Sequence, residues 1–117
     1  MIFAAFVLAP VGTGYAATTR AADRGETGIG LPGGKLDAGE DPLDAVIREA
    51  AEEGWAVVGL DPVPIHAQSV QGRPVVWFRA TGATALRTYK EQHRISTLVA
   101  TRDQVLASGY GNKNLPI

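Results

Sequence analysis

The sequence predicts an α/β sandwich with a mixed β-sheet. Short apolar runs of strand length recur along the chain, and two segments carry residues that begin helices. No internal repeat or linker separates these segments. A chain of 117 residues is typical of one domain, which buries roughly two-thirds of the surface of its unfolded chain. We therefore expect a single domain over residues 1–117.

The N-terminal segment is expected to contribute two strands. Residues 2–8 form an apolar run that predicts a buried strand, glycines near residues 12–14 predict a turn, and residues 15–20 would return. A secretory signal peptide is the alternative, but such peptides start with positive charge and this segment does not. A loop rich in glycine and charge follows, over residues 21–40.

The next element is a helix with clear start signals. Asp41 is a suitable N-cap, Pro42 fits the first helical position, and Asp44 lies near the positive end of the helix dipole. The helical period predicts an apolar stripe made of Leu43, Val46, Ile47 and Ala50.

Strands, a hairpin and a short helix are expected in the second half. The predicted strands are residues 55–60, 63–70, 74–80 and 95–100. The second and third of these would form a hairpin around residues 71–73. Residues 81–91 are ambiguous, with a loop and a helical turn as one interpretation. Thr101 would cap a helix over residues 101–108, and the tail is rich in turn residues.

Composition excludes several classes of function. A net charge of −1 lacks the basic surplus of proteins that bind nucleic acid polymers. The absence of cysteine excludes disulfides, thiolate zinc sites and cysteine nucleophiles, and fits a reducing, cytoplasmic setting. No apolar run is long enough to cross a bilayer, so no membrane partner is expected.

Residues 34–53 are the most informative stretch, because they place several glutamates on one predicted helix behind a glycine-rich loop. Glu49, Glu52 and Glu53 share a helix face, where like charges destabilise a helix by roughly 0.2–0.5 kcal/mol per pair. Two of them fall in the last turn, where the dipole disfavours anions by roughly 0.3–1 kcal/mol. A hard divalent cation bound by these carboxylates would relieve both penalties.

The spacing of this stretch resembles the Nudix box, in which Gly, five residues, Glu and seven residues precede Arg-Glu-U-x-Glu-Glu-x-Gly-U, with U apolar. The residues in register are Gly34, Glu40, Arg48, Glu49, Ala50, Glu52 and Glu53, after a lead-in of GLPGGK. The last glycine of the box is missing, because Trp55 occupies its position and Gly54 comes one place early. We expect Gly54 to end the helix in the left-handed conformation.

The resemblance implies a Nudix-type α/β/α sandwich with a mixed β-sheet and a Nudix pyrophosphohydrolase. Such an enzyme cleaves the phosphoanhydride of a nucleoside diphosphate linked to another moiety. Mg²⁺ or Mn²⁺ would be held by Glu49, Glu52, Glu53 and the carbonyl of Gly34. Arg48 would pair with a neighbouring glutamate and fix its rotamer. Glu40 would tie the loop to the helix or border the metal site.

The family's general base often lies outside the box, and Glu91 is the best-placed acid for that role. An exposed loop residue is the more common explanation of such a glutamate. The expected catalytic set is Arg48, Glu49, Glu52, Glu53 and Glu91, and the expected substrate-binding residues are Gly33, Gly34 and Lys35.

Other interpretations of the same residues stay open at this point. REAAEE alone is an ordinary helix-forming string, so a solvated charged face is the alternative to a metal site. A phosphate-binding P-loop fails, because Ile29 and Leu36 stand where that motif needs Gly and Ser or Thr. A non-catalytic Nudix-fold nucleotide-binding module is the main rival, since a displaced helix end at Trp55 could move Glu53. An interaction protein with an acidic helix face is the second.

The remaining candidates have weaker support. Trp77 and Phe78 are expected in the core, and His66 on the polar side of its strand. Trp55, Tyr89 or Tyr110 could stack on a nucleobase, and Arg73, Arg79, Arg87 or Lys90 could contact phosphates, although solvated charge is the safer expectation. We expect the partner to be a small nucleotide substrate, and the sequence does not specify its leaving group. A homodimer in which a second subunit completes the pocket is left open.

Overall fold

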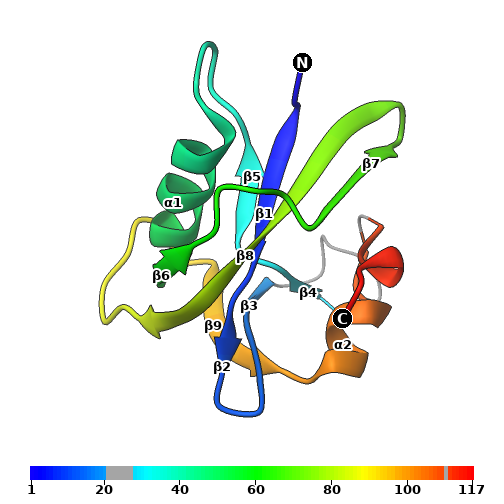
Figure 1. The fold of residues 1–117 in the computed structure, drawn as a ribbon. Coiled ribbons are helices and arrows are strands. Elements are labelled where there is room, and N and C mark those ends of the chain that lie inside the picture. Colours follow the sequence, from blue (N-terminus) through cyan, green and yellow to red (C-terminus); the bar gives the residue numbers. More distant parts are fainter. Residues whose placement is uncertain (21–27, 110) are drawn as a thin grey trace.

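The computed structural model of the chain describes residues 1–20, 28–109 and 111–117. Its larger sheet has five strands in the order β5-β1-β8-β6, with β7 paired to β8 (Figure 1). These strands are β1 (Ala4–Leu8), β5 (Gly33–Lys35), β6 (Trp55–Leu60), β7 (His66–Val70) and β8 (Arg73–Ala85). Strands β1 and β8 run parallel and the other pairs antiparallel, so the sheet is mixed, as predicted.

A second, four-stranded sheet is antiparallel throughout. Its strands are β2 (Pro10–Val11), β3 (Gly14–Arg20), β4 (Ile29–Gly30) and β9 (Ile95–Ala100). The predicted turn near residues 12–14 joins β2 to β3, with Val11 opposite Gly14. The returning strand therefore pairs with β2 and β9 and not with β1, which lies in the other sheet between β5 and β8.

Strand β1 is buried on both of its faces, and this places the helices on opposite sides of the sheet. Ala5, Val7 and Ala9 belong to a core with Val46 and Ala50 of α1 (Pro42–Glu52). Ala4, Phe6 and Leu8 belong to a second core with Val105 of α2 (Arg102–Ala107) and Leu115 beside the 3₁₀ helix η1 (Asn112–Asn114). Alternate side chains of a strand point to opposite faces. The result is the predicted α/β/α arrangement.

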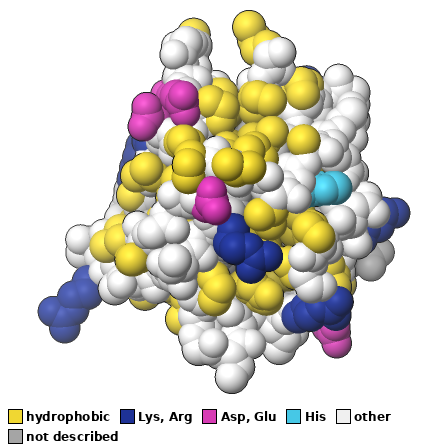
Figure 2. Space-filling view, in the orientation of Figure 1, with side chains coloured by type: hydrophobic (Ala, Val, Ile, Leu, Met, Phe, Trp, Pro, Cys, Tyr) yellow, Lys and Arg dark blue, Asp and Glu magenta, His cyan; other side chains and the backbone are white. Residues whose placement is uncertain are grey.

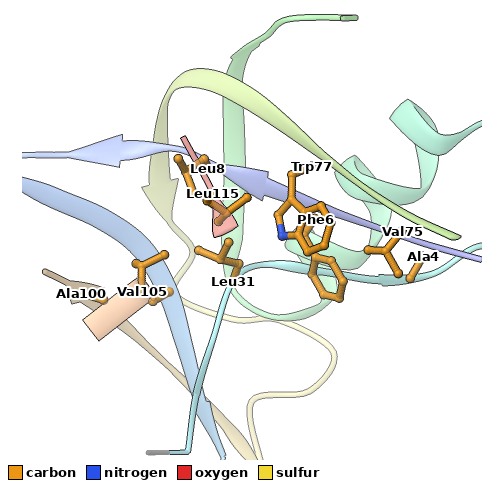
Figure 3. Packing of buried hydrophobic residues seen from close by; sticks show 10 residues of the cluster. Ala4, Phe6, Leu8, Leu31, Val75, Trp77, Ala100, Val105 and Leu115 are labelled. Atoms are coloured by element: carbon orange, nitrogen blue, oxygen red, sulfur yellow. The ribbon is translucent and has the colours of Figure 1, made fainter. Parts of the chain in front are cut away.

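The second core is organised around Trp77, which is fully buried as predicted. Figure 3 shows the rings of Phe6 and Trp77 next to one another, with their centroids 6.2 Å apart. Leu8, Leu31 and Leu115 continue the same layer (Figure 3). The indole N–H of Trp77 donates to Oδ1 of Asn112 at 3.0 Å, so its polar atom is satisfied inside the core.

The helix caps and the hairpin agree with the sequence. Thr101 caps α2, because its Oγ1 accepts from the backbone N–H of Gln104 at 3.1 Å while Oε1 of Gln104 accepts from the backbone N–H of Thr101 at 2.8 Å. The hairpin of β7 and β8 turns at Gln71 and Gly72, which have φ angles of 53° and 79°. Positive φ at both central residues is the geometry of a tight hairpin turn.

Two segments differ from the predictions. Strand β7 begins at His66 rather than at residue 63, since prolines at positions 62 and 64 lack the N–H that a ladder needs. The ambiguous segment 81–91 is strand as far as Ala85, because β8 keeps pairing with β6 up to Trp55 opposite Ala85. Turns occupy most of residues 87–94.

The predicted apolar stripe of α1 is wrong at one position. Ile47 is 50% exposed, whereas Ala45, which the prediction left out, is fully buried with Val46 and Ala50. Figure 2 shows hydrophobic side chains on the face over α1 and the segment between β6 and β7. No helix among the described residues has the length and apolar character needed to cross a membrane.

Candidate active site

Helix α1 carries the charged residues of the candidate site, and its start follows the sequence signals. Oδ1 of Asp41 accepts from the backbone N–H of Leu43 at 2.8 Å, and Pro42 is the first helical residue. These contacts satisfy one free N–H and remove another at the helix start. The buried side of the helix faces the sheet, so Arg48, Glu49 and Glu52 lie on its flank.

Helix α1 ends at Glu52 with Glu53 as its C-cap, and Gly54 follows with a positive φ, as expected of a glycine that stops the helix. Gly54 has φ +105°, and a Cβ there would lie 2.5 Å from Cγ2 of Thr97 and 3.0 Å from the ring of Tyr89. Trp55 is 3% exposed and donates its indole N–H to the carbonyl of Ala17 at 2.9 Å. Trp55 is therefore a core residue that joins the helix end to β3, and its expected alternative as a base-stacking residue is wrong.

Arg48 joins the loop before the helix to the acidic face. Its Nε and Nη2 donate to the two carboxylate oxygens of Glu40 at 2.9 and 2.8 Å. Its Nη1 contacts Glu49 Oε1 at 3.0 Å and Glu52 Oε2 at 3.4 Å. Its Nη2 also donates to the carbonyl of Lys35 at 3.2 Å. The predicted pairing of Arg48 with a neighbouring glutamate is confirmed.

Glu40 ties the loop to the helix, which is the first of its two expected roles. Its Oε1 accepts from the backbone N–H of Asp37 at 2.9 Å as well as from Arg48. The hydrogen bond from Arg48, followed by that from Asp37, lowers the pKa of Glu40 to about 2. The same bidentate contact with Glu40 raises the pKa of Arg48 further above its ordinary value. This pair is charged across the whole physiological pH range.

Glu49 lies directly against the backbone of the glycine loop. A Cβ at Gly34 would lie 2.8 Å from Oε2 and from Cδ of Glu49, so only glycine leaves room for this carboxylate. Burial raises the pKa of Glu49, although its hydrogen bond with Arg48 opposes the shift. A cation at this carboxylate would remove part of the electrostatic penalty of its burial.

The other two box glutamates point in different directions. Glu53 is 3% exposed, and its Oε1 accepts from the backbone N–H of Gly33 at 3.0 Å. Glu52 instead contacts Arg48 with one oxygen and lies 3.9 Å from Nζ of Lys90 with the other. Glu53 is therefore buried at the pocket, and the helix end at Trp55 does not displace it from there.

A pocket of about 400 Å³ brings most of the predicted site residues together. The glycine loop contributes Gly33, Gly34 and Lys35, and the carboxylates are Glu49, Glu53 and Glu91. Its other walls are mostly apolar or basic and include Phe3, Phe6, Val70, Val75, Arg73 and Arg94. Arg48 and Glu52 do not line this pocket. They lie beside it and reach it through the contact of Arg48 with Glu49.

The donor chemistry of the pocket fits a hard divalent cation. Carboxylate oxygens and a backbone carbonyl are the ligands that Mg²⁺ and Mn²⁺ prefer, and the lack of a side chain on Gly34 lets the carboxylate of Glu49 lie close to the backbone of the glycine loop. Within residues 1–20, 28–109 and 111–117, no three acidic or histidine side chains converge closely enough to hold a metal ion. Glu52 would have to leave Lys90 and turn toward the pocket to complete the expected ligand set.

Glu91 lies on a turn that packs against the end of α1. Its backbone N–H donates to the carbonyl of Glu52 at 2.9 Å, which explains why it shares a pocket with residues some forty positions earlier. Its Oε2 contacts Nε of Arg94 at 2.7 Å. The hydrogen bond from Arg94 lowers the pKa of Glu91, so this carboxylate is charged near neutral pH.

Among the weaker candidates, the histidine, the tyrosines and the basic residues, only Arg73 lines the pocket within the part of the chain that the structure describes. His66 has its ring centroid 5.2 Å from that of Trp77, and its Nε2 is 2.9 Å from Oε1 of Gln68. The hydroxyl of Tyr89 donates to the carbonyl of Ile95 at 2.7 Å, which makes Tyr89 a brace of the turn. Tyr110 lies outside the described residues. Arg79, Arg87 and Lys90 do not line the pocket, and Arg73 does.

Sequence reasoning missed Phe3 and Arg94 in the pocket wall. The guanidinium of Arg73 lies 4.4 Å from the centroid of the Phe3 ring, and Nζ of Lys35 lies 5.7 Å from it. The sequence did not mark Phe3 as a pocket residue, because Phe3 belongs to the same apolar run as strand β1. The spacing of three positions between Glu91 and Arg94 was a usable signal, since residues so spaced meet within a turn.

Comparisons with known proteins identify the family and the fold of this chain. The sequence model of the NUDIX domain family matches residues 3–106. A search of curated proteins finds no match. A solved MutT, from work on the proteins of Aliivibrio salmonicida and Vibrio cholerae, is similar with a TM-score of 0.71 and 17% identity, covering 97% of this chain and 90% of that one.

Two further solved structures have similar folds. A MutT NUDIX hydrolase from Burkholderia pseudomallei has a TM-score of 0.61 and 23% identity, over 86% of this chain and 82% of that one. An ADP compounds hydrolase has a TM-score of 0.59 and 18% identity, over 81% of this chain and 54% of that one. At these identities the likeness shows a shared fold, and the residue arrangement of the pocket is this chain's own.

Proposed function

This chain belongs to the NUDIX hydrolase family, and we propose that it is a divalent-metal-dependent pyrophosphohydrolase acting on a nucleoside diphosphate linked to another moiety. The observation that carries the proposal is that three carboxylates, those of Glu49, Glu53 and Glu91, line the same pocket as the backbone of Gly34. The pocket volume of about 400 Å³ is within the range of small-molecule sites.

Four oxygen donors would hold Mg²⁺ or Mn²⁺, namely the carboxylates of Glu49, Glu52 and Glu53 and the carbonyl of Gly34. A bound divalent ion would lower the pKa of water and neutralise phosphate charge. Arg48 contacts both Glu49 and Glu52, so it limits the rotamers of two of the ligands. Glu40 holds Arg48 by two hydrogen bonds and would act only through it.

Glu91 would serve as the general base. It takes a proton from water while the water oxygen bonds to a phosphorus of the bridge, and the bond from that phosphorus to the bridging oxygen breaks. The electron pair of the broken bond leaves with the departing group. The products are a nucleoside monophosphate or diphosphate and the remaining phosphorylated product. A positioned base typically contributes roughly 10²–10⁴-fold to the rate.

The cations of the pocket suit phosphate groups. Lys35 and Arg73 both line it, and neither forms an ion pair with an acid among the residues that the structure describes. Both lie near the Phe3 ring, so they border one side of the pocket, while the glutamates supply its acidic groups. Lys35 and the backbone of Gly33 and Gly34 are the proposed substrate-binding groups.

A substrate panel tests the proposal. The purified chain with Mg²⁺ or Mn²⁺ is incubated with ordinary and oxidised nucleoside triphosphates, nucleotide sugars, ADP-ribose and dinucleoside polyphosphates, and the release of phosphate and monophosphate is measured. Turnover of at least one class that stops on addition of EDTA supports the proposal. Binding of a nucleotide without turnover of any compound would favour a nucleotide-binding module instead.

A further inference from the structure

The turn that carries Glu91 is joined by backbone hydrogen bonds to the end of the acid-bearing helix α1. The backbone N–H of Leu86 donates to the carbonyl of Gly54 at 2.8 Å, and that of Glu91 to the carbonyl of Glu52 at 2.9 Å. Within the turn, the hydroxyl of Tyr89 bonds the carbonyl of Ile95 at 2.7 Å. These bonds fix the Cα of Glu91 relative to the pocket. They leave the three side-chain torsions of Glu91 to be fixed by other contacts.

Arg94 supplies such a contact. Its Nε lies 2.7 Å from Oε2 of Glu91, a short distance typical of a charge-assisted hydrogen bond. Both side chains line the pocket, and the side chain of Glu91 is only 20% exposed against 53% for Arg94. The backbone N–H of Arg94 donates to the carbonyl of Glu91 at 3.0 Å, so the backbone of the turn holds the two residues in register.

The acidic residues of the pocket give the Glu91–Arg94 ion pair a role that an ion pair elsewhere on the surface would not have. Glu49, Glu53 and Glu91 line one pocket, where like charges repel one another. Arg48 offsets this repulsion on the helix side through Glu49 at 3.0 Å. Arg94 does so on the turn side through Glu91. Without Arg94, repulsion from the helix carboxylates would favour rotamers of Glu91 that point out to solvent.

We propose that Arg94 is a positioning residue, which holds the carboxylate of Glu91 in the pocket for proton abstraction from the attacking water. The inference rests on the proposed function and adds to it a residue outside the Nudix box. Arg94 engages one carboxylate oxygen of Glu91 and thereby orients the other. Misplacement of a reacting group by about 1 Å can lower a rate by about 10²-fold, so a single rotamer change has a measurable effect.

The experiment is a double-mutant cycle on kcat and KM, using the best substrate of the panel. Arg94→Ala is expected to lower kcat by about tenfold or more while KM changes by less than about threefold. Arg94→Lys should recover part of the loss, because an ammonium can still reach the carboxylate. In the Glu91→Gln background, Arg94→Ala should change kcat by less than about twofold, since it acts through Glu91.

Arg102→Ala is the matched control. Arg102 is exposed to a similar extent, at 58%, and it also contacts a nearby acid, Asp103, but it does not line the pocket. Thermal unfolding of every variant checks the fold, and Arg94→Gln replaces Arg94→Ala if the latter is unfolded. An ion pair with an exposed arginine contributes little to stability, so the unfolding temperatures of Arg94→Ala and Arg102→Ala should be similar.

Three results would overturn the inference while leaving the proposed function in place. Arg94→Ala could keep kcat within twofold of wild type, its effect could persist undiminished in Glu91→Gln, or it could raise KM alone, as a direct phosphate contact would. A wild-type chain that hydrolyses nothing in the panel is a different outcome. It would refute the proposed function itself and this inference with it.

Discussion

Glu49 and Glu91 line the same pocket and each contacts an arginine, yet their pKa values shift in opposite directions. Burial against Gly34 raises the pKa of Glu49. The hydrogen bond from Arg94 lowers that of Glu91. Arg48 is shared among several carboxylates, whereas Glu91 has a close arginine partner within its own turn. On the helix side of the pocket (the helix wall, with Glu49), burial outweighs the charge compensation from Arg48, whereas on the side of the turn (the turn wall, with Glu91) the contact with Arg94 outweighs burial.

This difference separates two kinds of carboxylate by environment alone. A poorly compensated, partly buried carboxylate gains most from a bound cation, which suits a metal ligand. A well-compensated carboxylate stays charged near neutral pH and can therefore accept a proton, which suits a general base. Substitutions in the helix wall, the glycine loop, the helix end and the loop anchor perturb these environments one at a time.

Glu52→Gln should have the largest effect. It removes the charge of a proposed ligand without changing its shape, so turnover should fall by more than about 100-fold, beyond the effect typical of residues outside the ligand set. The fold should be intact, because the change also relieves repulsion on the helix. Steady-state kinetics at saturating Mg²⁺ and the far-UV spectrum measure the two effects. Activity within a few-fold of wild type would count against the assignment.

Gly34→Ala should separate function from stability in the glycine loop. The new Cβ would lie 2.8 Å from the carboxylate of Glu49, which is the movable end of its side chain. We expect Glu49 to swing away, with a loss of turnover of about tenfold or more and a small change in unfolding temperature. Gly109→Ala is the control, because a Cβ there meets nothing within 4 Å. Equal activity of the two variants would refute the steric argument.

Gly54→Ala should destabilise the helix end. At φ +105° alanine is strained, and its Cβ would lie 2.5 Å from Thr97. A residue forced into such a conformation loses about 1–3 kcal/mol of stability. Urea unfolding monitored by tryptophan fluorescence measures the change. If the free energy of unfolding is unaffected, Gly54 is not the residue that replaces the missing box glycine.

The pH dependence of stability tests the anchor made by Glu40, and this effect should be the smallest. Its pKa is about 2 in the folded chain against an ordinary value of 4.5. Because the folded value is the lower one, Glu40 stabilises the fold above pH 4.5, and this contribution is lost as the pH falls toward 2. Urea midpoints measured between these pH values should fall more steeply for wild type than for Glu40→Gln. Parallel curves would contradict the role of Glu40.

The helix wall could be predicted from the sequence, and the turn wall only in part. Helical spacing fixes which side chains share a face, and caps fix where a helix starts, so α1 and its glutamates followed from local rules. Ile47 was misplaced because the angular limit of the buried stripe depends on how α1 docks on the sheet. The extension of β8 to Ala85 depends on pairing with β6, which is not a local property.

The pocket itself depends on contacts between distant segments. Glu91 lies near the glutamates of α1 because its backbone N–H donates a hydrogen bond to the carbonyl of Glu52. No local sequence pattern encodes that hydrogen bond. Phe3 and Arg73 meet at the pocket because β1 and β8 run parallel. The orientation of Glu52 toward Lys90 could not be foreseen either, since the box spacing alone places all three glutamates on one face.

The two tryptophans give this chain a built-in pair of optical probes. Trp55 belongs to the core between the sheet and α1, and Trp77 to the core on the opposite side of β1, each with its indole N–H bonded to a different partner. Replacing either one by phenylalanine leaves a single emitter that reports on one layer. Emission shifts on adding Mn²⁺ or nucleotide would then show whether the helix layer responds to ligand separately from the layer beneath it.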